Sequence, residues 1–187
     1  MPFIQLCDKT KHKFTDENGD LVPFTPNIDV IANALCYINR YTGHVGAYSV
    51  AQHSLHVFAE MQKLLPDDYE MQLAALLHDA TEAYLNDISK PLKDLLPDYR
   101  AIEDFYVGII DEHFNINTGH DMIKMIDKRI LKTEGESFGL ELVANEYPHL
   151  SSYDYMIAIA PSPDDVFKKF MLAYYHLINE IEKRAMH

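Results

Sequence analysis

Apolar residues recur at intervals of three or four along most of the 187-residue chain, and this spacing favours a helical fold. Ile28, Ile31, Leu35 and Ile38 are one such stripe. Amphipathic helices of this kind bury their apolar faces against one another. The sequence therefore predicts an all-α fold, a single-domain bundle of about six helices that spans residues 1–187.

Capping residues and helix breakers indicate where the helices begin and end. Ser49 is a good N-cap, Gly43 is a C-cap glycine, and Ser162-Pro163 is a typical helix start. We expect helices over residues 28–42, 50–65, 68–84, 98–114, 120–143 and 163–184, and the third, apolar almost all round, should be central and buried. Residues 1–26 should form an irregular arm that can hold a short hairpin, and residues 155–159 one extended stretch.

The charge balance argues against several classes of partner. Sixteen Lys and Arg against 29 Asp and Glu give a net charge of −13, whereas broad binding to nucleic acid or to an anionic membrane needs a basic face. No apolar run approaches the roughly 18 residues of a membrane span, and the first residues do not resemble a signal peptide. Cys7 and Cys36 are too few for a disulfide scaffold and fit free thiols in a reducing cytosol.

A histidine and an aspartate, His78 and Asp79, directly follow the apolar run at residues 75–77. Charged residues are rarely buried unless they are paired or bind a metal. On a helix both side chains could reach one ion, and Glu82 would project from the same face one turn later. Taken alone, however, the dipeptide is more simply explained as a helix cap or as a satisfied pair in the core.

Two further residues change that balance, because His53 lies on the preceding predicted helix and Asp127 on the fifth. A histidine, then His-Asp, then an aspartate on successive helices is the order of the HD superfamily of metal-dependent phosphohydrolases. The chain resembles the small, single-domain members of that family found in bacteria and phages. The resemblance covers about residues 27–175, and its matching segments are 40–44, 48–54, 75–84, 87–88, 91–93, Asp127, 133–134 and 160–163.

The resemblance implies that His53, His78, Asp79 and Asp127 bind one divalent metal. Two imidazoles and two carboxylates form a mixed shell that suits Mn, Co, Fe, Ni or Mg better than a closed structural zinc site. The expected cofactor at this site is a transition metal (Mn, Co, Fe, Ni or Zn), and Mg is a candidate for a second site. A metal held in this way can polarise a phosphoryl oxygen.

Glu82 matches the family's glutamate three residues after the His-Asp pair. The resemblance implies that Glu82 and Asp79 are catalytic. Glu82 either takes a proton from the attacking water or helps to hold a second metal, for which Asp87 is a further candidate. Lys93 and Lys124 match basic positions that hold phosphates in similar triphosphohydrolases, and Lys124 lies three residues before a predicted metal ligand, on the same helix face.

The irregular N-terminal stretch of the family usually contributes contacts to phosphate and base. Here it reads Lys11-His12-Lys13-Phe14, which departs from the common Gly-Arg-Lys-Phe form and leaves the register open. Lys11, His12 and Phe14 are the candidates for substrate contacts. His44 also matches the family, either in the site or as support for the turn that follows it.

The resemblance implies a metal-dependent phosphohydrolase that acts on deoxynucleotides. The first hypothesis is a dNTP triphosphohydrolase, with dATP as substrate, because the predicted lysines could hold three phosphates; the alternative is a 5′-deoxynucleotidase that acts on dNMPs. A non-catalytic, nucleotide-binding regulatory module is a hypothesis of a different class. We further expect a small-molecule nucleotide as partner rather than nucleic acid or membrane, a homo-oligomer, and a cytoplasmic location in a bacterial cell or a phage-infected host.

Overall fold

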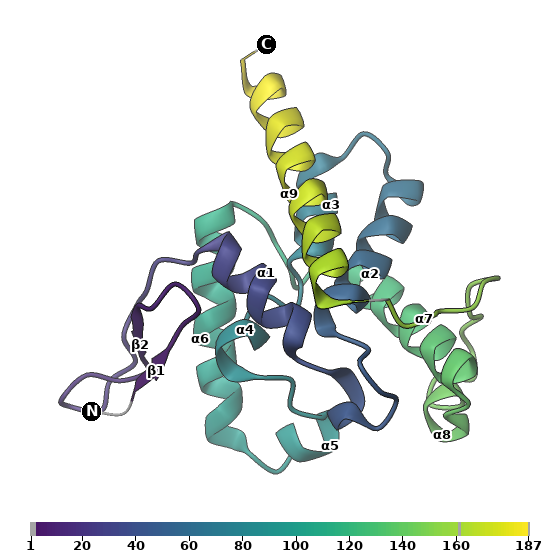
Figure 1. Ribbon diagram of the computed structural model, residues 1–187, viewed down its shortest axis with the longest axis horizontal. Coiled ribbons are helices and arrows are strands. Elements are labelled where there is room, and N and C mark those ends of the chain that lie inside the picture. The colour runs from purple at the N-terminus through teal and green to yellow at the C-terminus, as the bar shows by residue number, and fades with distance from the viewer. Residues whose placement is uncertain (1–2, 161, 187) are drawn as a thin grey trace.

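The computed structural model describes residues 3–160 and 162–186, and over these residues the chain is mostly helical (Figure 1). They form nine α-helices, a 3₁₀ helix at Arg40–Gly43 and a two-stranded hairpin, which confirms the predicted all-α class. The α-helices are α1 (Ile28–Tyr37), α2 (Val50–Leu64), α3 (Tyr69–Leu76), α4 (Glu82–Leu85), α5 (Lys90–Lys93), α6 (Pro97–Phe114), α7 (Asp121–Phe138), α8 (Glu141–Ala144) and α9 (Pro163–Ala185).

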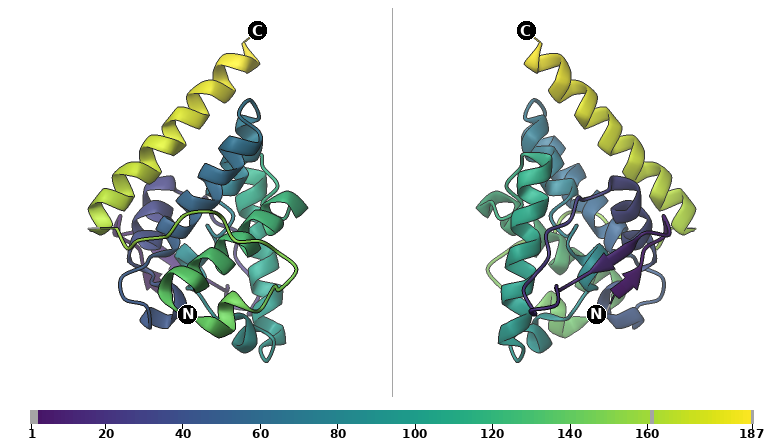
Figure 2. Two further views of the ribbon diagram at one scale, coloured as in Figure 1. Left: turned by 90° about the vertical axis from the view of Figure 1, so that its right-hand side faces the viewer. Right: turned by 90° about the vertical axis from the view of Figure 1, so that its left-hand side faces the viewer.

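The third predicted helix is central, as its composition indicates. Leu73 and Leu76 of α3 belong to a buried cluster shared with α1 and α9, whereas Ala74 and Ala75 belong to a second cluster shared with α2 and α7. An apolar helix packed on opposite faces links the two halves of the core. The long α9 leans against this core, and its C-terminal end projects past the other helices (Figure 2).

Several helix ends agree with the predicted caps. The side chain of Ser49 accepts a hydrogen bond from the backbone N–H of Gln52 at the start of α2, and Asp68 and Ser162 cap α3 and α9 in the same way. The predicted N-terminal hairpin is also present, with β1 (Phe3–Gln5) antiparallel to β2 (Lys11–Lys13). Pro161, part of the last matching segment, lies outside the described residues.

The first predicted helix ends five residues early, at Tyr37 rather than residue 42. Ile38 is already extended, and the backbone N–H of Arg40 donates to the carbonyl of Tyr48 instead of continuing the helix. Tyr41 and Thr42 then adopt left-handed backbone angles, with φ of 55° and 53°. This strained turn places the side chains of Arg40 and Tyr41 against α7.

The predicted helix over residues 68–84 is also wrong as one element, because α3 ends at Leu76 and α4 begins at Glu82. Between them the backbone forms tighter bonds between residues three apart, such as the one from the N–H of Glu82 to the carbonyl of Asp79. The fifth helix is likewise divided: α7 stops at Gly139, whose φ of 69° ends the helix, and α8 follows. The described residues of the 155–159 stretch form no β-strand.

Candidate metal centre and adjoining pocket

Four side chains from three parts of the fold meet at one point. His53 on α2, His78 in the turn after α3, and Asp127 on α7 each offer a ligand atom, and these atoms lie within 4.8 Å of one another. Asp79 joins them, since its Oδ2 is 3.7 Å from Nε2 of His53 and 3.2 Å from Nε2 of His78. The structure thus brings together all the predicted metal ligands.

Both histidines are oriented by bonds to the nitrogen that faces away from this point. Nδ1 of His53 lies 2.6 Å from Oε1 of Glu134, and Nδ1 of His78 lies 2.9 Å from the carbonyl oxygen of Ala75. If each Nδ1 carries the proton and donates it to its oxygen, each Nε2 keeps its lone pair, and this second-layer hydrogen bond is the usual support of metal-binding histidines.

The donor set fits a divalent metal. The Nε2 atoms of His53 and His78 are buried and make no hydrogen bond within the described part of the chain. A buried polar atom without a partner is costly, and two of them beside two carboxylates are satisfied together by one cation. Two neutral imidazoles and two carboxylates would also balance the charge of such an ion.

Glu134 contacts several residues of the candidate metal centre and of its surroundings. It is fully buried and accepts hydrogen bonds from the hydroxyls of Tyr41 (2.5 Å) and Tyr48 (2.7 Å) and from Arg40 (3.2 Å), besides that from His53. Burial alone would raise the pKa of Glu134, but Arg40 and then His53 outweigh it and hold this pKa well below its ordinary value. The carboxylate is therefore charged and fully paired.

Sequence reasoning gave Glu134 and Arg40 no role beyond belonging to matching segments. A signal was nevertheless present, because Glu134 continues the apolar stripe of Ile126 and Ile130 at a spacing of four. A carboxylate on a buried face needs partners. The partners come from residues 40–53, which precede Glu134 by 81 to 94 positions, and the stripe does not reveal them.

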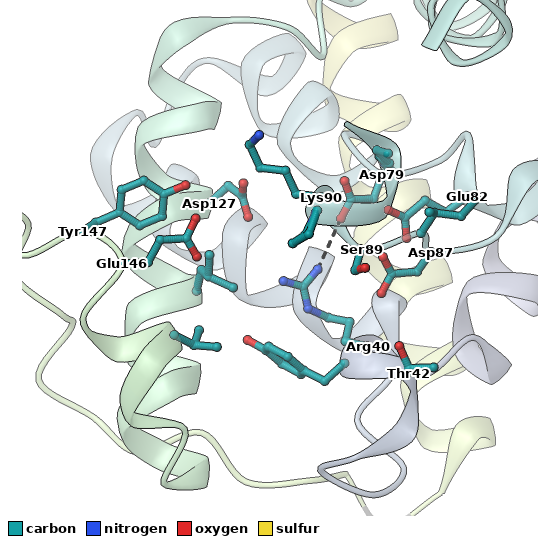
Figure 3. Close-up of a pocket in the computed structure, with 16 residues that line it drawn as sticks. Arg40, Thr42, Asp79, Glu82, Asp87, Ser89, Lys90, Asp127, Glu146 and Tyr147 are labelled. Atoms are coloured by element: carbon teal, nitrogen blue, oxygen red, sulfur yellow. Dashed lines mark ion pairs between the residues drawn. The ribbon is translucent and has the colours of Figure 1, made fainter. Parts of the chain in front are cut away.

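A pocket of about 430 Å³ opens beside the metal centre (Figure 3). Asp79 and Asp127 line it, so two of the four predicted ligands face the cavity, whereas His53 and His78 are not among its lining residues. In Figure 3 Arg40 points toward Asp79, with Glu82 and Asp87 beside this pair. The guanidinium of Arg40 is 3.7 Å from Oδ2 of Asp79, and it thus links the metal centre to the pocket wall.

Glu82 is buried at the edge of this pocket, and its Oε2 makes no hydrogen bond within the described residues. Burial first, and then the charges of Asp79 and Asp87, raise the pKa of Glu82 well above its ordinary value. Burial likewise raises the pKa of Asp87. A carboxyl group with a raised pKa in a pocket is suited to proton transfer near neutral pH.

Of the predicted phosphate contacts, Lys93 is in the pocket. It donates to Glu103 at 2.5 Å; burial opposes its charge, but Glu103 outweighs burial and raises the pKa of Lys93. Lys90, which the sequence did not single out, also lines the pocket and pairs with Asp94 at 2.8 Å. Together with Arg40 they are the cations among the lining residues.

The other predicted contacts lie elsewhere. Lys124 is exposed, faces Asp121 at 3.8 Å and does not line the pocket, because its helix face turns outward there. Lys11 is exposed on β2, with its ammonium 4.8 Å from the centroid of the Phe3 ring. His44 is exposed just after the 3₁₀ helix and is likewise absent from the lining.

His12 is part of the core and not of the pocket. It is buried, its Nε2 lies 2.6 Å from the hydroxyl of Tyr106, and Phe14 and Phe24 meet its ring edge-on. Burial lowers the pKa of His12, as expected for a neutral imidazole among aromatic rings. His12 and Phe14 therefore fasten the N-terminal hairpin to α6 in this structure.

The comparisons with known proteins support one relationship. No family model matches the chain. It is 39% identical over 145 residues to the uncharacterized protein YfdR of Escherichia coli K12, which covers 75% of each chain. It is also 41% identical over 102 residues, 52% of each chain, to the uncharacterized protein RCAP_rcc00048 of Rhodobacter capsulatus. No helix in the described residues has the length and apolar character that a membrane crossing requires. By its similarity over three quarters of both sequences, the chain belongs to the protein family of YfdR.

Proposed function

We propose that the protein is a metal-dependent phosphohydrolase that acts on deoxynucleotides. The observation that carries the proposal concerns the Nε2 atoms of His53 and His78, which make no hydrogen bond within the described residues and lie beside the carboxylates of Asp79 and Asp127. Both aspartates line a pocket that is also lined by Arg40, Lys90 and Lys93. The resemblance of the ordered motif to the HD superfamily supports it. A divalent metal held by these four residues would supply Lewis acidity at a phosphoryl oxygen.

The pocket's own residues would bind and orient the substrate. Asp79, Asp127, Glu82 and Asp87 place many carboxylates around the cavity, so an anionic phosphate needs nearby positive charge. Lys90, Lys93 and Arg40 provide it from the same pocket. Because Arg40 is held by Glu134, its position would be fixed before substrate binds.

Glu82 would move the proton in the proposed hydrolysis. A water oxygen forms a bond to phosphorus while the bond from phosphorus to the ester oxygen breaks. Oε2 of Glu82, which has no other partner among the described residues, accepts the proton of that water and passes it to the leaving oxygen. A cation bound beside Asp79 would lower the pKa of Glu82, and the carboxylate form would then be available as a base.

Two substrates of one class are compatible with this chemistry. Lys90, Lys93 and Arg40 are enough positive groups for a triphosphate, so a dNTP triphosphohydrolase with dATP as substrate stays the first proposal. Lys11 and Lys124, however, lie outside the pocket, and the smaller number of cations favours a 5′-deoxynucleotidase as the second candidate. The unpartnered carboxyl oxygen of Glu82 argues against a purely regulatory binding module.

The test is a product assay. Protein loaded with Mn²⁺ or Co²⁺ is incubated with dATP and with dAMP, and the products are separated by chromatography. Deoxyadenosine with tripolyphosphate from dATP identifies the triphosphohydrolase, whereas deoxyadenosine with phosphate from dAMP identifies the nucleotidase. Asp79→Asn should abolish either reaction, and Asp154→Asn, an exposed aspartate outside the pocket, should leave it unchanged. No turnover on a full panel of dNMPs and dNTPs would overturn the proposal.

A further inference from the structure

The pocket has two chemically different sides. The lysines Lys90 and Lys93 come from α5, whereas Glu146 and Tyr147 come from the turn after α8. In Figure 3 Glu146 and Tyr147 lie across the cavity from Glu82 and Asp87, with Asp127 on their side. Apolar side chains of Leu131 and Val143 also line the pocket. A ligand with a phosphate at one end and a flat, less polar group at the other matches this division.

The side that carries Tyr147 is fastened to α7. Nζ of Lys132 donates to the carbonyl oxygen of Ala144 at 3.0 Å and approaches that of Tyr147 at 3.5 Å. The ammonium of Lys128 lies 5.5 Å from the centroid of the Tyr147 ring, and Lys128 does not line the pocket. The ring is therefore positioned in advance, which reduces the entropy lost when a ligand stacks on it.

Glu146 and Tyr147 offer complementary contacts. An ionised carboxylate only accepts hydrogen bonds. Glu146 is exposed and forms no ion pair among the described residues, but it accepts a hydrogen bond from the hydroxyl of its neighbour Tyr147. A tyrosine ring stacks on any nucleobase, whatever its identity. The ring thus supplies general affinity for a base, and the carboxylate selects groups that donate a hydrogen bond.

We infer that Tyr147 and Glu146 bind the nucleobase of the substrate and select bases that carry an exocyclic amino group. Adenine, cytosine and guanine can donate from that amino group to Glu146. Thymine has no amino group, and its ring N3–H lies between two carbonyl oxygens that the carboxylate repels. This inference rests on the proposed function, since it assumes that a nucleotide phosphate binds near Lys90 and Lys93. It adds which residues contact the base and which bases they favour.

Equilibrium binding tests the inference without turnover. In a Glu82→Gln variant loaded with Mn²⁺, the Kd values of dAMP, dTMP and inorganic phosphate are measured by titration calorimetry. We expect dAMP to bind about tenfold more tightly than dTMP, as for a hydrogen bond to a charged acceptor. Adding Glu146→Gln should bring this ratio close to one, because an amide can both donate and accept. Tyr147→Ala should weaken both nucleotides about tenfold, and Tyr147→Phe should not.

Matched variants separate the outcomes. Glu141→Gln changes an exposed glutamate at the start of α8 that does not line the pocket, and it should leave every Kd unchanged. Inorganic phosphate should bind equally well to the Glu146 and Tyr147 variants. If both nucleotides bind but Glu146→Gln does not change their ratio, the inference is overturned and the proposed function stands. If neither phosphate nor any nucleotide binds, both are overturned.

Discussion

Glu134 on α7 lies 2.6 Å from Nδ1 of His53 on α2, and this contact joins the buried charge network to the candidate metal centre. The carboxylate fixes the plane of the imidazole and directs its Nε2 toward Asp127, 3.1 Å away. The same carboxylate holds Arg40, which reaches Asp79. One buried side chain thus positions groups on three parts of the fold before any ligand binds.

Removing the charge of Glu134 should weaken metal binding. Glu134→Gln keeps the size of the side chain but gives His53 a weaker acceptor, and loss of such a second-layer carboxylate typically costs about 10- to 100-fold in affinity. The affinity for Mn²⁺ is measured by competition with a chelator. Glu136→Gln, an exposed glutamate two residues further along α7, is the control. An unchanged affinity in Glu134→Gln would show that the contact does not support a metal.

Metal affinity should rise with pH up to about 9. Burial and then Arg40 lower the pKa of His53, but Glu134 and Asp127 outweigh them and raise it to about 9 in the metal-free protein. Since a metal binds only the neutral imidazole, a proton competes with it below that pH, and the affinity should fall about tenfold for each pH unit. Calorimetry in buffers of different ionisation enthalpy should detect about one proton released. Binding that is independent of pH between 6.5 and 8.5 would contradict this assignment.

That the side chains of the candidate metal centre lie close together could be predicted from the sequence, because their order along the chain is itself informative. His53 and Asp127 fall on helical stripes, and His78-Asp79 directly follow one. The stripes and caps locate both ends of α2 and α9 and the starts of α3 and α7 to within one residue, but not the ends of α3 and α7. Helical stripes and caps are set by residues close together in the sequence, and for this reason the sequence alone is enough to locate them.

What could not be predicted depends on contacts between distant residues. The helix before Arg40 ends early because Arg40 and Tyr41 bind Glu134, ninety-odd positions later, which no local period records. The placement of Lys124 away from the pocket has the same origin, since sharing a helix face with Asp127 does not fix where that face meets its neighbours. Contacts in the tertiary structure, and not the local sequence, determine where α1 ends and where Lys124 lies.

His56 should make the protein sensitive to acid. Burial first, and then His53, lower the pKa of His56 to about 4, and its ring is stacked between those of Tyr48 and Tyr155. Because the unfolded chain takes up this proton near pH 6.5 and the folded protein only near 4, stability falls as the pH drops through that window, by up to about 3 kcal/mol.

Urea denaturation at pH 7.5 and pH 5, with a chelator present, measures the part of this loss that is complete by pH 5, about 2 kcal/mol. His56→Phe, which keeps a ring between the two tyrosines, should lose less stability between the two pH values than the wild type. His149→Phe, a change at an exposed histidine, should behave like the wild type. Equal losses in wild type and His56→Phe would mean that His56 is not the group responsible.

Two glycines should respond to alanine in opposite directions. A Cβ on Gly135 of α7 would lie 2.6 Å from the backbone nitrogen of Ala144, so Gly135→Ala must push α8 away and should cost about 1–3 kcal/mol. Gly108 of α6 has no atom within 4 Å of the same position, and Gly108→Ala should stabilise the helix by about 0.5–1 kcal/mol. Chemical denaturation gives both values. Because α8 leads into Tyr147, Gly135→Ala should also weaken nucleotide binding, whereas Gly108→Ala should not. A Gly135→Ala protein as stable as the wild type would refute the close packing of α7 and α8.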